Sequence, residues 1–355
     1  AKAALGLTLH EAENAFARAI VNDGVLDIRD LSVVQEEKRQ AVRKSGLLEV
    51  VEAGVNLADV GGLENLKRWL AKREGSWLAA AAEYGLPAPR GVLITGVPGC
   101  GKSLTAKAVA AAWELPLLRL DIGRVFSGLV GSSEQNLRTA IRTAEATSPC
   151  VLWIDEIEKG LAPESGDSGT TSRIFGTFLT WMQEKTRPVF VIATANDIDR
   201  LPPELLRKGR FDEIFFVDLP TRVERSAIWR VHLTRRLRSP AVAGGLVVDD
   251  DLLTELSALT EGYSGAEIEQ AVIAGLFEAF SARRPLERDD LVRAVATMVP
   301  LSVTQAERID AIRAWATTRA VAATAAEDWD LGSRRAGGGP GGPPPGPHGG
   351  RLVEY

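Results

Sequence analysis

The stretch from Gly96 to Ser103 has the residue types and the spacing needed to hold a phosphate group. It fits the pattern G-x-x-x-x-G-K-[S/T] and reads Gly96, Val97, Pro98, Gly99, Cys100, Gly101, Lys102 and Ser103, followed by Leu104. Glycine can adopt backbone angles that turn several N–H groups toward one anion. Lys102 would then reach the β- and γ-phosphates of a nucleotide, and Ser103 would ligate Mg²⁺. The pattern therefore predicts a site for ATP and Mg²⁺.

The elements around this stretch are those that such a loop requires. A short apolar run over residues 91–95 predicts a strand before it, and an alanine-rich pattern over residues 102–114 predicts a helix after it. The positive end of that helix would add to the attraction for phosphate. Cys100 fits either a redox switch, because a helix N-terminus lowers a thiol pKa, or a small loop residue, which we favour.

Two neighbouring carboxylates are the next candidates for chemistry. Four apolar residues, 151–154, precede Asp155 and Glu156, which predicts a buried strand that ends where the phosphates would lie. Asp155 would hold Mg²⁺ directly or through water, and Glu156 would polarise the attacking water as general base. Two solvated acids at a strand end are the alternative, which the phosphate loop upstream disfavours.

Three further polar residues complete the candidate catalytic set. Asn196 lies at the end of the next predicted strand, where it would orient the attacking water; an ordinary turn residue is the alternative. Arg207 and Arg210 precede the last predicted strand. They fit a pair of arginines that reach the phosphate of a neighbouring subunit, or else a solvated basic turn.

Short apolar runs alternate with helical patterns in the middle of the chain. The predicted strands are 91–95, 117–120, 150–154, 189–194 and 214–217, and the helices between them are 102–114, 133–146 and 172–183. This alternation predicts an α/β fold with a five-stranded parallel sheet, whose ligand lies at the carboxyl ends of the strands. Only helical patterns follow Pro220, so an all-α domain should come after the sheet.

The patterns divide the chain into five segments. They are a helical N-terminal segment or remnant of a larger domain (1–57), the α/β domain (58–220), a helical domain (221–300), a long C-terminal helix (301–335, with the helix itself over 304–325) and a tail (336–355). The tail is rich in Gly and Pro, so we expect it to be disordered. Its last residues, 351–355, fit a docking peptide or a frayed end, and we favour the frayed end. Residue 1 is Ala, which fits a processed or truncated piece of a longer protein.

Composition narrows the class of protein. The chain has 355 residues, of which 45% are hydrophobic and 25% are charged, as in a soluble globular protein with a sizeable core. The net charge of −5 argues against a nucleic-acid-binding surface. Cys100 and Cys150 are too few for a disulfide framework or a cysteine zinc site, and they indicate a reducing, cytoplasmic location. No apolar run is long enough to span a membrane.

Taken in order, these motifs resemble those of the AAA ATPases. The likeness covers about residues 56–299 and includes an adenine-side loop with Asp59 and Gly61, the Walker A stretch 96–103, the Walker B stretch 151–156, Asn196 as sensor 1, Arg207 and Arg210 as arginine fingers, and Gly265 and Ala266 in the lid motif. The resemblance implies a P-loop NTPase sheet followed by a helical lid. It also implies a homo-oligomeric ring, commonly of six subunits, with ATP at the subunit interfaces.

A finer likeness is to poorly characterised AAA proteins of cyanobacteria, algal plastid genomes and other bacteria, based on runs such as 150–157 and 166–173. In AAA rings that thread proteins, an aromatic residue occupies the position of Leu129, and leucine offers a smaller apolar face. The glycine- and serine-rich stretch 160–169 fits a second pore loop or a flexible connection equally well.

These features lead to one functional hypothesis and one alternative. The first is a ring-forming ATPase that remodels or disassembles an unknown protein client. The alternative is an ATP-dependent regulatory switch or assembly factor that does not thread its partner. A nucleic-acid motor is disfavoured by the acidic charge.

Overall fold

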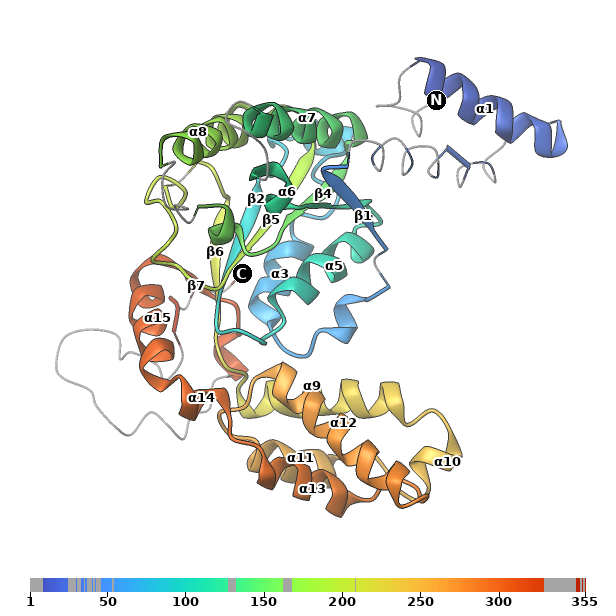
Figure 1. Ribbon diagram of the computed structural model, residues 1–355, viewed down its shortest axis with the longest axis vertical. Coiled ribbons are helices and arrows are strands. Elements are labelled where there is room, and N and C mark those ends of the chain that lie inside the picture. The colour runs from blue at the N-terminus through green and yellow to red at the C-terminus, as the bar shows by residue number, and fades with distance from the viewer. Residues whose placement is uncertain are drawn as a thin grey trace. The chain divides into compact units, whose positions relative to one another are not determined.

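The computed structural model describes residues 9–24, 30, 33–34, 36, 40, 42, 46–52, 54–126, 132–161, 168–207, 209–328, 349–351, 353 and 355 (Figure 1). The chain divides into two compact units. Unit 1 comprises Ala1–Gly54, Arg73–Leu93 and Val109–Glu213, and unit 2 comprises Val55–Lys72, Ile94–Ala108 and Ile214–Tyr355. The limits of the five segments predicted from the sequence stay predictions.

Among the described residues, seven strands form one mostly parallel sheet in the order β1-β3-β4-β5-β2-β6-β7. The strands are β1 (Leu48–Val51), β2 (Gly91–Gly96), β3 (Leu117–Leu120), β4 (Cys150–Ile154), β5 (Val189–Ala195), β6 (Glu213–Val217) and β7 (Val321–Ala322). All five predicted strands are present, as β2 to β6. Every residue of β4 and β5 is buried, which explains why their sequences are apolar except for Thr194.

The sheet is larger than we predicted because two strands lie in segments expected to be helical. β1 pairs antiparallel with β3, from Leu48 opposite Leu120 to Val51 opposite Leu117. β7 pairs in parallel with β6, although its alanine-rich surroundings favour a helix. Pairing with a distant strand overrides local propensity at both places.

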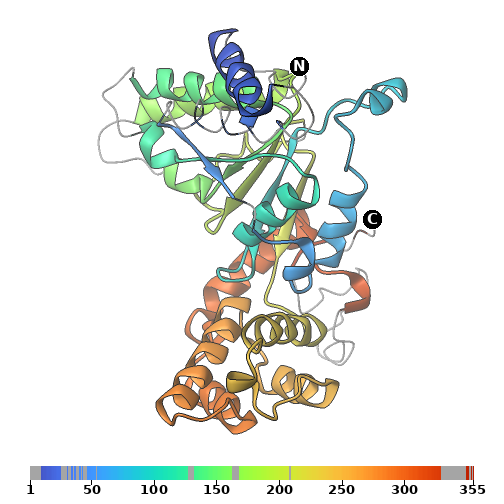
Figure 2. The ribbon, with the colours of Figure 1, turned by 90° about the vertical axis from the view of Figure 1, so that its right-hand side faces the viewer.

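Helices connect the strands. In unit 1 they are α1 (Leu9–Asp23), α4 (Ala79–Glu83), α6 (Ile122–Phe126), α7 (Ser132–Thr147), the short η4 (Ile157–Leu161) and α8 (Ser168–Glu184). The helix α5 (Lys102–Ala112) begins in unit 2 and ends in unit 1. The helices α7 and α8 pack side by side, and α6 contacts α7 (Figures 1 and 2). In the N-terminal segment that we expect to be helical, most of residues 25–45 lie outside the described residues.

Unit 2 carries the remaining helices. They are η3 (Leu57–Asp59), α3 (Glu64–Ala71), α9 (Arg222–Arg236), α10 (Pro240–Ala243), α11 (Asp250–Leu259), α12 (Gly265–Ser281), α13 (Arg288–Thr297), α14 (Leu301–Thr304), α15 (Ala306–Arg319) and η5 (Ala326–Asp328). The predicted long C-terminal helix therefore ends at Arg319, before β7. None of the described helices has both the length and the apolar character needed to cross a membrane.

Four of these helices, α9, α11, α12 and α13, form the lid bundle, drawn in yellow and orange in Figure 2. Their apolar faces enclose a core that includes Trp229, Leu253, Ile268 and Leu291, each completely buried. A capping box begins α12, because Ser264 accepts a hydrogen bond from the Glu267 N–H and Glu267 accepts one from the Ser264 N–H.

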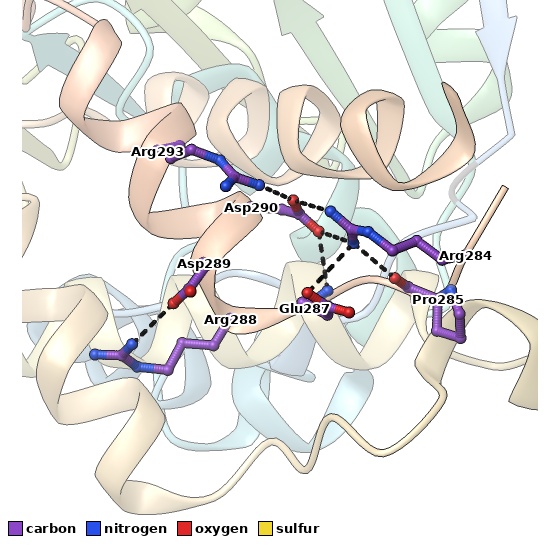
Figure 3. Close-up of polar contacts among 7 residues, drawn as sticks. All are labelled: Arg284, Pro285, Glu287, Arg288, Asp289, Asp290 and Arg293. Atoms are coloured by element: carbon purple, nitrogen blue, oxygen red, sulfur yellow. Dashed lines mark hydrogen bonds and ion pairs between the residues drawn. The ribbon is translucent and has the colours of Figure 1, made fainter. Parts of the chain in front are cut away.

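A buried carboxylate fixes the turn from α12 into α13 (Figure 3). Asp290 is fully buried, and its Oδ2 and Oδ1 accept hydrogen bonds of 2.6 Å and 2.8 Å from the two terminal nitrogens of Arg284. Oδ1 also accepts a 2.5 Å bond from Arg293, and Oδ2 accepts one from the Glu287 N–H. The Arg284 guanidinium lowers the pKa of Asp290 well below its usual range, so this carboxyl stays ionised.

We expect Asp290→Asn to destabilise the lid bundle by about 2 kcal/mol or more at neutral pH, because it removes the buried charged partner of Arg284. Since the folded-state pKa is depressed, the stabilisation is complete above the unfolded-state pKa near 4 and is lost as the pH falls through the folded-state value. Urea unfolding of the unaltered chain and of the Asp290→Asn variant measures the difference in stability. The exposed neighbour Asp289 is the matched control, and Asp289→Asn should change stability by no more than about 0.5 kcal/mol. Equal effects of the two substitutions would contradict the assignment.

Candidate nucleotide-binding site

The phosphate loop in unit 2 joins the end of β2 to the start of α5 and lies against β6. Gly96 has φ +137°, and a Cβ atom there would lie 1.9 Å from the carbonyl oxygen of Val217. The Val97 N–H donates a 2.9 Å hydrogen bond to that same oxygen. Only glycine permits this approach. On the other side of the loop, a Cβ at Gly101 would meet nothing within 4 Å, so that side stays open.

Lys102 folds back over this loop. Its ammonium group donates to the carbonyl oxygens of Gly96 at 2.9 Å and of Val97 at 2.8 Å, and the residue is buried. Ser103 follows it in the first turn of α5, at the positive end of the helix. A cation, a hydroxyl and a helix N-terminus thus converge on one loop, which is the arrangement that binds a phosphate.

The lid motif is brought into direct contact with the phosphate loop. The Ala266 N–H donates a 2.9 Å hydrogen bond to the carbonyl oxygen of Gly99. Gly99 has φ +77°, and a Cβ there would lie 3.1 Å from both the Ala266 Cβ and the Ser264 Oγ. The predicted residues Gly265 and Ala266 therefore meet the predicted loop at the N-terminus of α12.

The adenine-side loop also belongs to unit 2, where it is held against α9. A Cβ at Gly61 would lie 2.6 Å from Cγ1 of Ile228, so the loop packs tightly on that helix. Glu224, also on α9, accepts a 2.9 Å hydrogen bond from the Leu63 N–H, and burial raises the pKa of this carboxyl. Asp59 accepts a 2.8 Å bond from the Asn56 N–H, which caps η3.

Cys100 behaves as a small, partly buried loop residue. It packs against a cluster formed by Val97, Leu219 and Ile309. Burial raises the pKa of its thiol to about 12, so almost none of it is thiolate at neutral pH. Because the thiolate is the reactive form, this supports the favoured interpretation over the redox switch.

The predicted acids in unit 1 form one hydrogen-bonded group with Asn196. The Asn196 Nδ2 donates to Glu156 Oε1 at 2.9 Å. Between the acids lies Thr194, whose hydroxyl donates to Asp155 Oδ1 at 2.6 Å and accepts from the Glu156 N–H at 3.0 Å. Glu156 has φ +50°, an uncommon conformation for a residue with a side chain, and these bonds hold it there.

Sequence reasoning missed three members of this group, Thr194, Glu158 and Lys159. Glu158 is buried, and its Oε1 accepts a 2.9 Å hydrogen bond from the Asn196 N–H. Its Oε2 is buried without a hydrogen-bond partner among the described residues, and burial raises its pKa. Lys159 forms an ion pair with Glu156, which raises the pKa of the lysine. The one available signal was spacing, since Thr194 and Glu158 each lie two positions from a predicted residue.

The two arginines lie on a fixed segment of unit 1. Arg207 is exposed, and the Arg210 guanidinium donates to the carbonyl oxygen of Glu204. The segment is held at its end by Asp212, which accepts hydrogen bonds from the N–H groups of Arg90 at 2.8 Å and Gly91 at 3.0 Å. Leu129 and residues 162–167 lie outside the described residues.

These motifs match those of a known protein family. Residues 92–219 match the family described as "ATPase family associated with various cellular activities (AAA)", and residues 1–45 match a SpoVK-like AAA ATPase second domain. The chain contains an AAA ATPase domain. It is 46% identical to the uncharacterized AAA domain-containing protein ycf46 of Pyropia yezoensis, over 89% of this chain and 63% of the relative, and 44% identical to that of Guillardia theta, over 89% and 61%.

The expected likeness to AAA proteins of algal plastid genomes is therefore confirmed. A cell division cycle protein 48 homolog of Archaeoglobus fulgidus is 35% identical, over 68% of this chain and 33% of the relative. The chain spans only about three fifths of the length of the plastid proteins that it matches.

We expect Glu158→Ala to lower ATP turnover about tenfold, the effect of about 1.4 kcal/mol, because the backbone of Asn196 loses its fixed acceptor. Glu158→Gln keeps an acceptor oxygen at this place and should retain most of the activity. Nucleotide affinity should stay unchanged in both variants, since Glu158 acts through Asn196 rather than on the phosphates. A steady-state ATPase assay with nucleotide titration measures both quantities. A loss of nucleotide affinity equal to the loss of turnover would contradict a positioning role.

Proposed function

We propose that this chain is an ATP-hydrolysing subunit of a homo-oligomeric ring that remodels or disassembles a protein client. The observation that carries this proposal is the hydrogen bond between Ala266 and Gly99, because it ties the phosphate loop to the lid bundle. A change in the phosphates bound at the loop would then be transmitted to α12 and move the lid. The AAA ATPase domain supports the same reading.

Each candidate residue has a role in this proposal. Lys102 and the loop N–H groups would bind the phosphates, and the loop with Asp59 and Gly61 would lie beside the adenine. Glu156 would take a proton from the attacking water, while Asn196 would position that water. Thr194 orients both acids, and Glu158 holds Asn196. Such a preset group lowers the reorganisation that the reaction requires.

The two residues predicted as metal ligands have side chains of the type that binds magnesium. Ser103 supplies a hydroxyl and Asp155 a carboxylate, and oxygen donors of this kind are what Mg²⁺ takes in proteins. We propose that these two residues hold the ion. When bound, Mg²⁺ would offset the negative charge of the phosphates.

Arg207 and Arg210 support the proposal of a ring, in which commonly six subunits assemble. Arg207 is an exposed arginine on a segment anchored by Asp212 and Arg90, and it is suited to reach another subunit because the backbone beneath it is fixed. We propose that both arginines act on the ATP of the adjacent subunit. Such a contact accelerates phosphoryl transfer by about 10³- to 10⁵-fold.

Two inactive variants should restore each other if the arginines act in trans. Arg207→Ala should lower turnover at least about a hundredfold with ATP still bound, and Glu156→Gln should bind ATP without turnover. In a mixture, an intact Glu156 meets an intact Arg207 at some interfaces, so ATPase activity should return. The control is a mixture of Arg207→Ala with the double variant, which offers no complete interface. Activity that does not return on mixing would contradict action in trans, and turnover by Glu156→Gln would contradict its role as general base.

The client is proposed to be a protein rather than a nucleic acid. The net charge is negative, and the relatives include a cell division cycle protein 48 homolog. Leu129 offers a smaller apolar face than an aromatic residue would, which favours mild remodelling over processive threading. The runner-up is an ATP-dependent switch or assembly factor, favoured by this same residue.

Addition of an unfolded protein should raise the ATPase rate severalfold, whereas DNA should leave it unchanged, because a remodelling ATPase couples turnover to its client. Steady-state ATPase assays with each addition measure this. Leu129→Ala should abolish the stimulation by protein and leave basal hydrolysis intact. Stimulation by neither addition would favour the switch, and stimulation by DNA alone would contradict a protein client.

A further inference from the structure

The described residues near the end of the sequence, 349–351, Val353 and Tyr355, lie against unit 2, and Arg351 pairs with the outer edge of β7. Arg351 lies beside Val321 in a parallel bridge. The Arg351 N–H donates to the carbonyl oxygen of Ala320 at 2.7 Å, and the Ala322 N–H donates to that of Arg351 at 2.9 Å. The frayed end that we expected is therefore wrong for this segment, because the edge of β7 gives its backbone groups partners.

Two glycines fit the start of this docked segment closely. The Gly349 N–H donates to Asp218 Oδ2 at 2.7 Å, and a Cβ there would lie 2.6 Å from the ring of Phe216 and 2.9 Å from Cα of Arg313. Gly350 has φ +99°, and a Cβ there would lie 2.8 Å from the backbone nitrogen of Ala322. The surface therefore selects glycine at both positions.

The other end of the segment is held by an amide and a ring. Asn65, buried on α3, donates to the carbonyl oxygens of Ala322 at 2.7 Å and of Val353 at 2.8 Å. It thereby joins β7 to the docked segment. The ring of Tyr355 lies 6.0 Å from that of Phe215, in a tilted arrangement. Backbone pairing with side-chain selection at alternate positions is how a peptide adds a strand to a sheet edge.

This docking surface contacts both loops that are expected to hold the nucleotide. Asp218 accepts a 2.7 Å hydrogen bond from the Leu219 N–H, and Leu219 packs against Val97 of the phosphate loop. Asn65 lies in the first turn of α3, directly after the adenine-side loop ends at Leu63. A segment that binds Asp218 and Asn65 therefore braces both loops.

We propose that the surface formed by β7, Asn65 and Asp218 is a peptide-binding site, and that its occupant is the chain's own segment 349–355. Occupancy holds the phosphate loop and the adenine-side loop in the form that binds ATP, a coupling that rests on the proposed function. Residues 329–348 connect this segment to the rest of unit 2, and about 20 residues can reach up to ~70 Å. The length therefore permits release and rebinding within one chain.

The binding site is tested with a labelled peptide of the sequence GGRLVEY and a chain that lacks residues 349–355. Fluorescence anisotropy should show saturable binding to the shortened chain. Binding to the full chain should be at least about tenfold weaker, because its own segment competes. A peptide carrying Gly350→Val is the matched control and should not bind. Failure of GGRLVEY to bind the shortened chain, or equal binding to both chains, would overturn the proposal.

The coupling is tested with a fluorescent ATP analogue. The shortened chain should bind it roughly tenfold more weakly than the full chain, the size of effect that one or two buried hydrogen bonds give, and added GGRLVEY should restore the affinity. Full-length Gly350→Val should show the same weakening, and circular dichroism should confirm that it is folded. Unchanged affinity in both variants would overturn the coupling. If the full chain itself binds no ATP analogue, the proposed function and the coupling fail, whereas peptide binding still decides the docking site.

Discussion

The close approach of the phosphate loop to β6 is the constraint on which the rest of unit 2 depends. Gly96 has φ +137°, and the Val217 carbonyl oxygen lies 1.9 Å from the place that a Cβ would take. Only glycine can therefore occupy this position. This fixes Val97, which then packs against Leu219 and Ile309. The start of the loop is thus held by β6 and by this apolar cluster.

In unit 1, the equivalent constraint is the hydroxyl of Thr194, which forms hydrogen bonds with both Asp155 and Glu156. Thr194 donates to Asp155 and accepts from the backbone of Glu156, so one side chain sets the position of both. The positive φ of Glu156 has an energetic cost of about 1 kcal/mol or more, which the surrounding hydrogen bonds offset. Asn196 completes the group through its side chain and its N–H. Hydrogen bonds with Thr194 and Asn196 therefore hold the two acids in place.

Much of the fold and of the candidate site could be predicted from the sequence, because local residue patterns indicate them. The five central strands are short and mostly apolar, and the glycine spacing of the phosphate loop is unusual enough to be recognised without a structure. Thr194 and Glu158 could not be found this way, since a threonine in a strand and a glutamate in a turn are common. Only the fold shows that their oxygens meet the predicted residues.

The added strands and the docked tail were missed for a different reason. β7 lies about a hundred residues from β6 in the sequence, and the alanine-rich stretch before it predicts a helix. Nothing local shows that Val321 pairs with Phe215 rather than continuing α15. The Gly349 and Gly350 positions looked like part of a low-complexity tail. Their meaning depends on Asp218 and Ala322, which only tertiary structure brings near.

The contact between the phosphate loop and the lid determines which substitutions can break the link between them. Ala266 donates through its N–H and Gly99 accepts through its carbonyl, so no side-chain atom takes part in the bond. A scan that replaces one side chain after another would leave this link intact and would not detect it. Only a proline at position 266 removes the donor itself. The bond itself thus depends on no side chain, but its setting does, because a side chain at Gly99 would crowd Ala266 and Ser264 and would have to adopt φ +77°.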